Sequence, residues 1–297
     1  MTMQDAAVSE STATGATAPF LDMDHAGYIV PDLQAAGAFM AQLGFTLTAR
    51  ADHTRTNAQG ELVSAGSAQH SLMLRRGYLE LMEIYDPSAG HQLASAVTVR
   101  HGLHVVAFGN RDADACHARC TAAGVPVGPL LHWARPVQEP DIAGLAKFAY
   151  FGSDWQPEDP SYLCWVEHRT PGLLRSERLL RHPNRALGLE ALRYSGPRAL
   201  AHAWARQLAA ATGVAWDEAA GTLVLPGFRF HIAIDDRAEQ VRPQVLQLAF
   251  DGLDALRERC AAMALPTTQR ADGMLDIDLT PQLGMHWHCR DASQDAG

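Results

Sequence analysis

One pattern recurs four times along the chain: a short apolar strand, an alanine-rich helix closed by glycine or proline, and then further strands. The expected helices span residues 32–43, 112–123, 197–212 and 253–264, and an apolar segment precedes each of them. Because a βαβββ unit of this kind cannot bury its own sheet face, the copies must pair. The repeat therefore predicts an α+β fold in which four βαβββ units form two paired domains.

The ends of the expected helices carry residues that cap helices. Asp32 and Asp112 stand where a side chain can accept hydrogen bonds from the first free N–H groups of a helix. Gly44 and Gly124 stand just past the opposite ends, and Pro197 suits the first turn of the third helix. Further strands are expected at residues 45–48, 70–74, 78–84, 125–127, 162–168, 214–216, 222–225, 228–234, 267–269 and 285–289.

The composition limits the kinds of partner. The chain has 297 residues, 47% hydrophobic and 19% charged, which is ordinary for a globular protein of two domains. A net charge of −9 without a cluster of basic residues argues against nucleic-acid binding. No apolar run approaches the roughly 18 residues of a membrane helix. A small molecule is therefore the expected partner.

The chain divides into five segments by composition. Residues 1–19 lack the basic and apolar parts of a signal peptide and are expected to be a disordered tail. A first domain is expected at residues 20–169, an Arg- and Pro-rich connector at 170–185, a second pair of units at 186–291 and a short tail at 292–297. Five scattered cysteines favour a reducing, cytoplasmic setting over a disulfide framework.

Several stretches in the first domain occur in a familiar order. They are Leu21-Asp22-Met23-Asp24-His25 with Val30-Pro31-Asp32-Leu33, Leu43-Gly44-Phe45-Thr46-Leu47-Thr48, Gly77-Tyr78-Leu79-Glu80-Leu81, Ala134-Arg135-Pro136-Val137 and Glu167-His168-Arg169-Thr170-Pro171. With these stretches the chain resembles the vicinal oxygen chelate superfamily, and most closely its glyoxalase-like domain proteins. The resemblance implies cupped mixed sheets and a divalent metal ion in the cup of the first domain.

The same resemblance implies which residues hold the metal, because the family takes its ligands from the first and last strands of each unit. Carried over, these are His25 and Glu80 from the first unit, and His104 with Glu167 or His168 from the second. Two imidazoles and one or two carboxylates suit Fe(II), Mn(II), Ni(II), Co(II) or Zn(II). No motif for a nucleotide cofactor is present.

Strand alternation separates neighbouring candidates. Glu80 and Glu83 point to opposite faces of one strand, and family position favours Glu80 for the cup. Glu167 and His168 are likewise opposed, and the residues alone do not decide which of them faces inward. The inward one is expected to be the fourth ligand or a catalytic base.

Four further residues are candidates for substrate binding. Arg135 can hold a carboxylate or phosphonate, although it could instead pair with Glu139 or Asp141. Trp133 and Phe148 could line an apolar cup for an aromatic substrate, although strand aromatics are more often core. Gln69 is the fourth candidate, although it departs from the resemblance, because the relatives tend to carry Asn near this position.

The second half carries less chemistry. His286 and His288 share a strand face, but no third ligand stands at an equivalent position. Residues 187–289 are therefore expected to be a degenerate pair with a structural or homodimer-forming role.

The leading hypothesis is a metal-dependent enzyme that stabilises charge on a chelated, oxygenated substrate, with isomerase, lyase or dioxygenase chemistry. The alternative is a non-catalytic protein that binds a drug or metabolite in the same cup. A third possibility is a scaffold dimer whose cup is filled by side chains.

Overall fold

A computed structural model describes residues 21–57 and 59–293 of the chain. The tail expected at residues 1–19 lies outside the described residues, as do residues 294–297 of the expected C-terminal tail. No helix within the described ranges is long and apolar enough to cross a membrane.

The chain forms two mixed sheets, and this confirms the predicted α+β fold. The first sheet has eight strands in the order β2-β3-β4-β1-β5-β8-β7-β6, and the second has seven in the order β10-β11-β9-β12-β15-β14-β13. The strands of the first sheet are β1 (Asp22–Ile29), β2 (Ala51–Thr56), β3 (Leu62–Met73), β4 (Tyr78–Ile84), β5 (Gly102–Gly109), β6 (Leu131–Glu139), β7 (Ile142–Gly152) and β8 (Tyr162–His168). Those of the second are β9 (Ala186–Gly196), β10 (Thr222–Val224), β11 (Arg229–Ile234), β12 (Arg242–Phe250), β13 (Thr267–Gln269), β14 (Leu275–Leu279) and β15 (Met285–Asp291).

One long helix follows the first strand of each unit, as the repeat predicts. These helices are α1 (Leu33–Gln42), α3 (Ala113–Ala122), α4 (Arg198–Thr212) and α5 (Asp254–Ala262); α2 (Ala96–Val99), α6 (Thr280–Leu283) and two 3-10 turns at Pro87–Ala89 and Pro171–Leu173 are short. The Asp32 and Asp112 carboxylates each accept a hydrogen bond of 2.9 Å from the backbone N–H three residues on. The predicted caps are therefore confirmed. Pro197 precedes α4 as its capping residue instead of lying in its first turn.

The expected short strands after the helices are mostly absent. Among residues 45–48, 125–127 and 214–216 only an isolated bridge forms, whereas 267–269 is β13. In the first two units the helix leads instead into a long hairpin, β2-β3 or β6-β7, and the expected strand 70–74 is the end of β3. The sequence missed these hairpins because their outer strands carry many polar residues.

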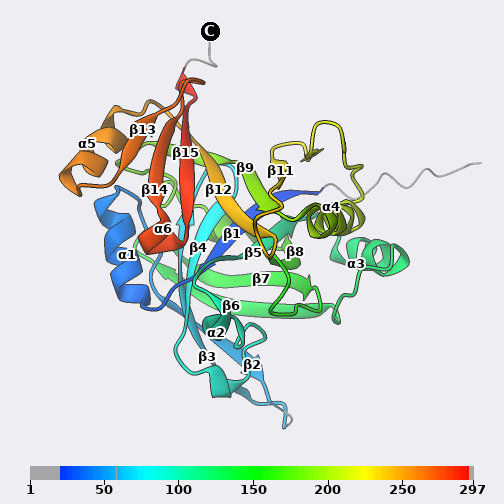
Figure 1. Cartoon of the computed structure of the whole chain (residues 1–297). Helices are drawn as coiled ribbons and strands as arrows, with labels where there is room; N and C mark the ends of the chain where they lie inside the picture. Colours follow the sequence, from blue (N-terminus) through cyan, green and yellow to red (C-terminus); the bar gives the residue numbers. More distant parts are fainter. Residues whose placement is uncertain (1–20, 58, 294–297) are drawn as a thin grey trace, which may run out of the picture.

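The two sheets pack against each other through one face of each. Tyr28, Phe108, Tyr194 and Trp287 are fully buried in the core between them, and the Trp287 indole N–H donates a 3.0 Å hydrogen bond to the Tyr28 hydroxyl. Helices α1 and α5 close one end of this layer, and α3 and α4 close the other (Figure 1). Each sheet thus hides one face in the shared core and leaves the other face outward.

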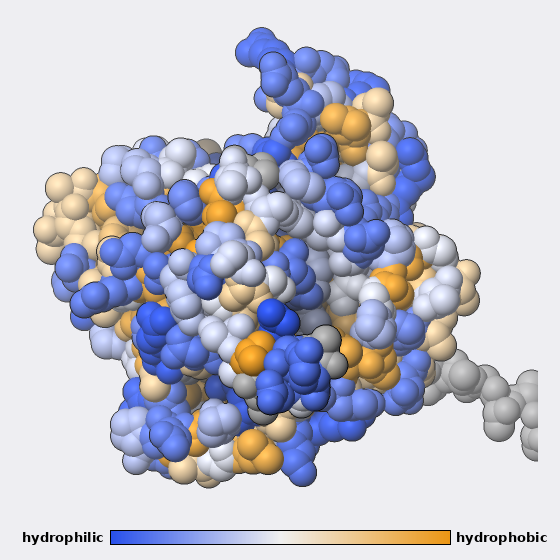
Figure 2. All heavy atoms as spheres, turned by 90° about the horizontal axis from the view of Figure 1, so that it is seen from below, coloured by the Kyte–Doolittle hydropathy of each residue, from blue (hydrophilic) through white to orange (hydrophobic). Residues whose placement is uncertain are grey.

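The surface seen from below mixes hydrophilic and apolar side chains without one continuous apolar area (Figure 2). Large exposed apolar residues are dispersed over the described chain, among them Leu131, Leu145, Leu200 and Val224. Single exposed apolar residues are normal on a protein surface. The expected homodimer therefore stays a prediction.

Candidate functional site

The outward face of the first sheet holds a cavity of about 490 Å³, which we call the cup. Strands from both units contribute to it, and its wall combines apolar and aromatic side chains with many polar ones, among them five histidines: His25, His53, His91, His132 and His168. Seven of the residues predicted from the sequence line it: His25, Gln69, Glu80, Trp133, Arg135, Phe148 and His168. His104 and Glu167 do not.

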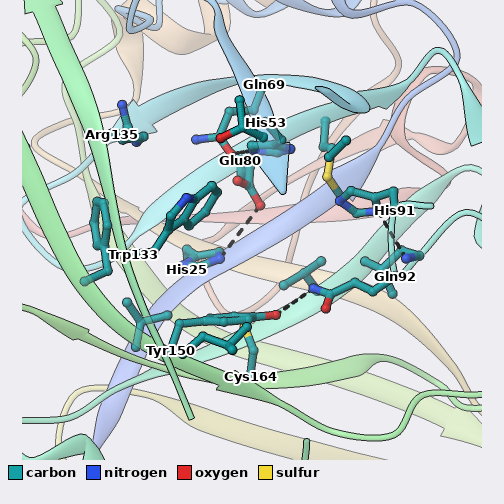
Figure 3. A pocket seen from close by; sticks show the side chains of 18 of the residues that line it. His25, His53, Gln69, Glu80, His91, Gln92, Trp133, Arg135, Tyr150 and Cys164 are labelled. Atoms are coloured by element: carbon teal, nitrogen blue, oxygen red, sulfur yellow. Dashed lines mark hydrogen bonds and ion pairs between the residues drawn. The ribbon is translucent and has the colours of Figure 1, made fainter. Parts of the chain in front are cut away.

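A line of titratable side chains runs along one wall of the cup. The His25 Nε2 atom lies 3.8 Å from a Glu80 carboxylate oxygen, and the two side chains point toward one another (Figure 3). The other ring nitrogen of His25, Nδ1, is 2.8 Å from one oxygen of Asp24. The second oxygen of Asp24 lies 2.9 Å from the Nε2 atom of His168. These contacts join Glu80, His25, Asp24 and His168 into one network.

Asp24 reaches both histidines because β1 is irregular at this residue. The antiparallel register with β5 shifts between Met23 and His25, so Asp24 is left without a cross-strand partner. A bulge of this kind re-aims a side chain that strict alternation would send to the opposite face from its neighbour. The sequence reading missed Asp24, although the adjacent Asp-His pair was visible.

The network shifts the pKa values of Asp24 and His25. Burial by itself would raise the pKa of Asp24, but His168 and His25 together hold that pKa well below its usual range. Burial would lower the pKa of His25, yet the Asp24 hydrogen bond and the Glu80 charge raise it above its ordinary value. His25 is thereby favoured as an imidazolium next to two carboxylates.

Asp24 is expected to act as a positioning residue for His25, since a carboxylate on Nδ1 holds the ring so that Nε2 faces the cup. The change Asp24→Asn should lower kcat by roughly 10-fold to 100-fold with little change in KM. If the reaction needs protonated His25, its rate declines as pH rises through the pKa of His25. Because the change removes a contribution that raises this pKa, the decline should move to lower pH in a pH–rate profile. An unmoved profile would contradict the assignment.

A glycine leaves room for the Glu80 carboxylate. A Cβ atom at Gly27 would lie 2.7 Å from the Cβ of Val105 and 3.1 Å from a carboxylate oxygen of Glu80. The His25 ring also stacks on Tyr78, with ring centroids 4.4 Å apart. The Glu80 carboxylate and the His25 ring are therefore both held in place by close packing.

The expectation that His25 and His104 share a site is wrong. In the first unit His25 pairs with Tyr78, and in the second unit the residue that pairs with the matching Tyr162 is Val105. Val105 lines the cup, whereas His104 is fully buried, with Nδ1 3.0 Å from the Gly102 carbonyl oxygen. An offset of one residue sends a strand side chain to the other face. Burial lowers the pKa of His104 to about 3, so it is a neutral core histidine.

The position equivalent to Glu80 in the second unit is Cys164, by the same register. Burial, with Glu80 and Asp24 nearby, raises the pKa of this thiol well above its ordinary value. By this register, the positions of the second unit that are equivalent to His25 and Glu80 carry Val105 and Cys164, and not the His104 and Glu167 or His168 that the resemblance implies. Within residues 21–57 and 59–293, no group of three or more His, Cys, Asp or Glu could hold a metal ion. The donor set does not fit the expected metal site.

The structure separates Glu167 from His168. A Glu167 carboxylate oxygen accepts a 3.1 Å hydrogen bond from the Ala113 N–H at the start of α3, while His168 lines the cup. Glu83 does the same for Leu33 at the start of α1, at 3.3 Å. These two carboxylates stabilise helix N-termini. The role of catalytic residue predicted for Glu167 is therefore wrong, and the role of metal ligand predicted for His168 is not supported, since its Nε2 atom bonds Asp24.

Arg135 is held in the cup without an acidic partner among the described residues. Its guanidinium lies over the Phe148 ring, 5.8 Å from the centroid. Arg178 pairs with both Glu139 and Asp141, which the sequence left open as partners of Arg135. That alternative is wrong, and Arg135 is available to an anionic ligand.

The remaining polar groups of the cup include two that the sequence reading missed. Tyr150 and Tyr162 hydrogen-bond to each other through their hydroxyls, and the Gln92 side-chain amide donates a 2.6 Å hydrogen bond to Tyr150. The hydrogen bond between the two tyrosines uses the proton of one hydroxyl group. The proton of the other hydroxyl group is available to donate to a ligand. The Gln69 side-chain oxygen lies 2.7 Å from the Nε2 atom of His53.

Comparison with known proteins agrees with this architecture. Two cupped mixed sheets built from paired βαβββ units define the vicinal oxygen chelate type of fold. Residues 23–211 match the family model described as a glyoxalase-like domain, and the chain belongs to this family. No curated protein matches the chain.

Solved structures share the fold at low sequence identity. A hypothetical protein from Staphylococcus aureus is 12% identical with a TM-score of 0.61, and the match covers 91% of this chain and 99% of that one. A mutant of 4-hydroxymandelate synthase from Streptomyces coelicolor is 16% identical with a TM-score of 0.57, covering 91% and 92%. A Mn(II)-bound glyoxalase from Novosphingobium aromaticivorans is 12% identical with a TM-score of 0.54, covering 91% and 82%.

Proposed function

We propose that the chain is a small-molecule enzyme of the glyoxalase-like class. It removes a proton from the carbon next to a carbonyl group of the substrate and returns it to the same or the neighbouring atom. The observation that carries the proposal is the His25–Glu80 pair, which is backed by buried Asp24 and faces an aromatic cavity. An acid and a base that face one substrate site can exchange a proton between two atoms of the substrate.

The sequence-based hypothesis placed a metal ion at the centre of the reaction. His25 and Glu80 of the first unit face each other, whereas the structurally equivalent positions of the second unit carry Val105 and the buried thiol of Cys164. Because transition-metal sites ordinarily use at least three protein donors, the proposed reaction is derived from proton transfer alone.

In the proposed reaction the Glu80 carboxylate accepts a proton from the carbon beside the carbonyl. The His25 imidazolium donates a hydrogen bond to the carbonyl oxygen as negative charge develops there, and the free hydroxyl proton of the Tyr150–Tyr162 pair supplies a second one. Return of the proton to the same carbon gives exchange, and its return to the next atom gives an isomer.

The substrate class follows from the rest of the wall. Arg135 suits a carboxylate, and Trp133 and Phe148 suit an aromatic ring. We therefore propose aryl-substituted 2-oxo or 2-hydroxy carboxylates as the substrates.

The test is the exchange of the proton beside the carbonyl for deuterium, followed by proton NMR with phenylpyruvate and mandelate in D2O. Enzyme-dependent exchange that is lost in Glu80→Gln supports the proposal. Glu83→Gln is the matched control, because Glu83 lies on the same strand and caps α1 on the opposite face. Exchange that persists in Glu80→Gln would overturn the role of Glu80 as the base.

Elemental analysis of the same preparations separates the metal-dependent reaction from proton transfer alone. About one transition-metal ion per chain that is lost in both His25→Ala and Glu80→Gln would favour the metal-dependent reaction. The second candidate function is a non-catalytic binding protein. It is favoured by Val105 and Cys164, which stand where a complete set of metal ligands would need two further donors. Ligand binding without proton exchange would support this alternative.

Arg135→Gln should weaken the binding of phenylpyruvate by roughly 10-fold to 100-fold, because a hydrogen bond to a charged group contributes about 1.5–3 kcal/mol. Isothermal titration calorimetry measures the change. The amide analogue of phenylpyruvate is the control ligand, since it carries no charge and should lose little. Equal losses for both ligands would mean that Arg135 does not bind the carboxylate.

A further inference from the structure

A second cavity of about 330 Å³, which we call the junction cavity, lies where the two sheets meet. Its wall is formed by the start of β1, the turn before β4 and Asn110. The second half of the chain contributes Leu189 and Gly227. Of the residues in this wall, the reaction proposed above uses only Asp24, which positions His25. His168 lies between this cavity and the cup, since it lines both.

Asn110 gives this cavity an unsatisfied polar group. The side chain is 8% exposed, and neither its amide nitrogen nor its oxygen has a hydrogen-bond partner among the described residues. The equivalent residue of the first unit is Val30: the N–H groups of both residues donate to a carbonyl of the last strand, Val30 to Met82 and Asn110 to Val166. A buried amide without partners is costly where a valine fits. A ligand in the cavity would supply the missing partner.

The charge of the wall indicates which ligand. Arg75 is exposed and has no ion pair in the described part of the chain, and Arg175 uses one guanidinium nitrogen on the carbonyls of Leu74 and Arg75. Arg76 is already paired with Glu190. The wall contains four arginines, Arg75, Arg76, Arg111 and Arg175, against the two carboxylates of Asp22 and Asp24, and this excess of positive charge favours an anion.

The two acidic side chains of the wall are already engaged. Both Asp24 oxygens bind histidines, and one Asp22 oxygen accepts hydrogen bonds from the N–H groups of Met23 and Gly227. A Cβ atom at Gly227 would lie 2.6 Å from the Asp22 carboxylate, so a larger residue there would displace this carboxylate. These contacts fix the carboxylates of Asp22 and Asp24 in the wall. The guanidinium groups of Arg75 and Arg175 and the Asn110 amide stay available to a ligand.

We propose that the junction cavity is a binding site for a small oxyanion, of phosphate or carboxylate type, held by Asn110, Arg75 and Arg175. The guanidinium groups supply charge-assisted hydrogen bonds, and the Asn110 amide donates one more. The site is separate from the cup and does not depend on the reaction proposed for it.

The experiment is a titration of the full chain with inorganic phosphate and, separately, with succinate, followed by isothermal titration calorimetry. One site per chain is expected, with affinity for at least one of the two anions, and the preferred anion identifies the chemical class. Asn110→Val and Arg75→Gln should each weaken binding by roughly tenfold or more. Asn110→Val copies the residue of the first unit, so it should keep or raise the thermal stability.

Arg237→Gln is the matched control, because Arg237 is exposed and lines neither cavity, and Arg135→Gln reports on binding in the cup. Three results would overturn the proposal: no binding of either anion at millimolar concentration, affinity unchanged in both junction variants, or a loss in Arg135→Gln alone. The last result would place the anion in the cup. Failure of the exchange assay leaves this titration unaffected, so the two proposals fail separately.

Discussion

Replacement of His25 by alanine is expected to lower the rate of deuterium exchange by roughly 10²–10⁴-fold. The change removes the ring that lies 3.8 Å from Glu80 and leaves Asp24 with one imidazole partner instead of two. Because the exchange requires an acid and a base on the same substrate, the loss should appear mainly in kcat. Single-turnover rates by NMR measure it.

His286→Ala is the control for this prediction, because His286 lies on the second sheet, outside the cup, and pairs with Asp276. It should exchange at the wild-type rate. The thermal midpoint of His25→Ala shows whether the variant is folded. A folded His25→Ala protein with wild-type exchange would remove His25 from the reaction.

The second large effect concerns the core between the sheets. Trp287→Ala should lower the free energy of unfolding by about 3–5 kcal/mol, the usual cost of truncating a buried tryptophan. Trp287 is fully buried, and its N–H donates to Tyr28 of the other sheet, so the change opens a cavity and leaves a hydroxyl with one partner fewer. Urea unfolding measures the change.

The same experiment tests whether the two sheets unfold together. Since the core is shared, we expect one transition at a lower urea concentration, observed equally by circular dichroism and by fluorescence. Trp133→Ala is the control, because this side chain is half-buried in the cup wall and should cost much less. A separate early transition of the second half would contradict a shared core.

The repeat of strand, helix and strands was sufficient to predict the fold. Four apolar strands with capped helices define βαβββ units, and such units must pair, which the two mixed sheets confirm. Helix starts were equally readable, because Asp32 and Asp112 cap through contacts three residues away. Local contacts of this kind are encoded locally and do not depend on the rest of the chain.

The sequence predicted which residues line the cup better than it predicted the roles of these residues. His25, Glu80, Arg135 and His168 all line the cavity. Which neighbour on a strand faces inward depends on the register between strands distant in sequence, and a shift of one residue reverses the answer. That is why His104 and Glu167 were misplaced and why Val105 and Cys164 were not foreseen.

By itself, the sequence determined the periodic features of this protein: the units, their helices and the residue types near the site. Only the tertiary structure decided the contacts between segments far apart. The bulge at Asp24 and the network from Asp24 to His168 both join such segments. Their geometry follows from strand register and from the packing of one sheet on the other, and no local pattern specifies either.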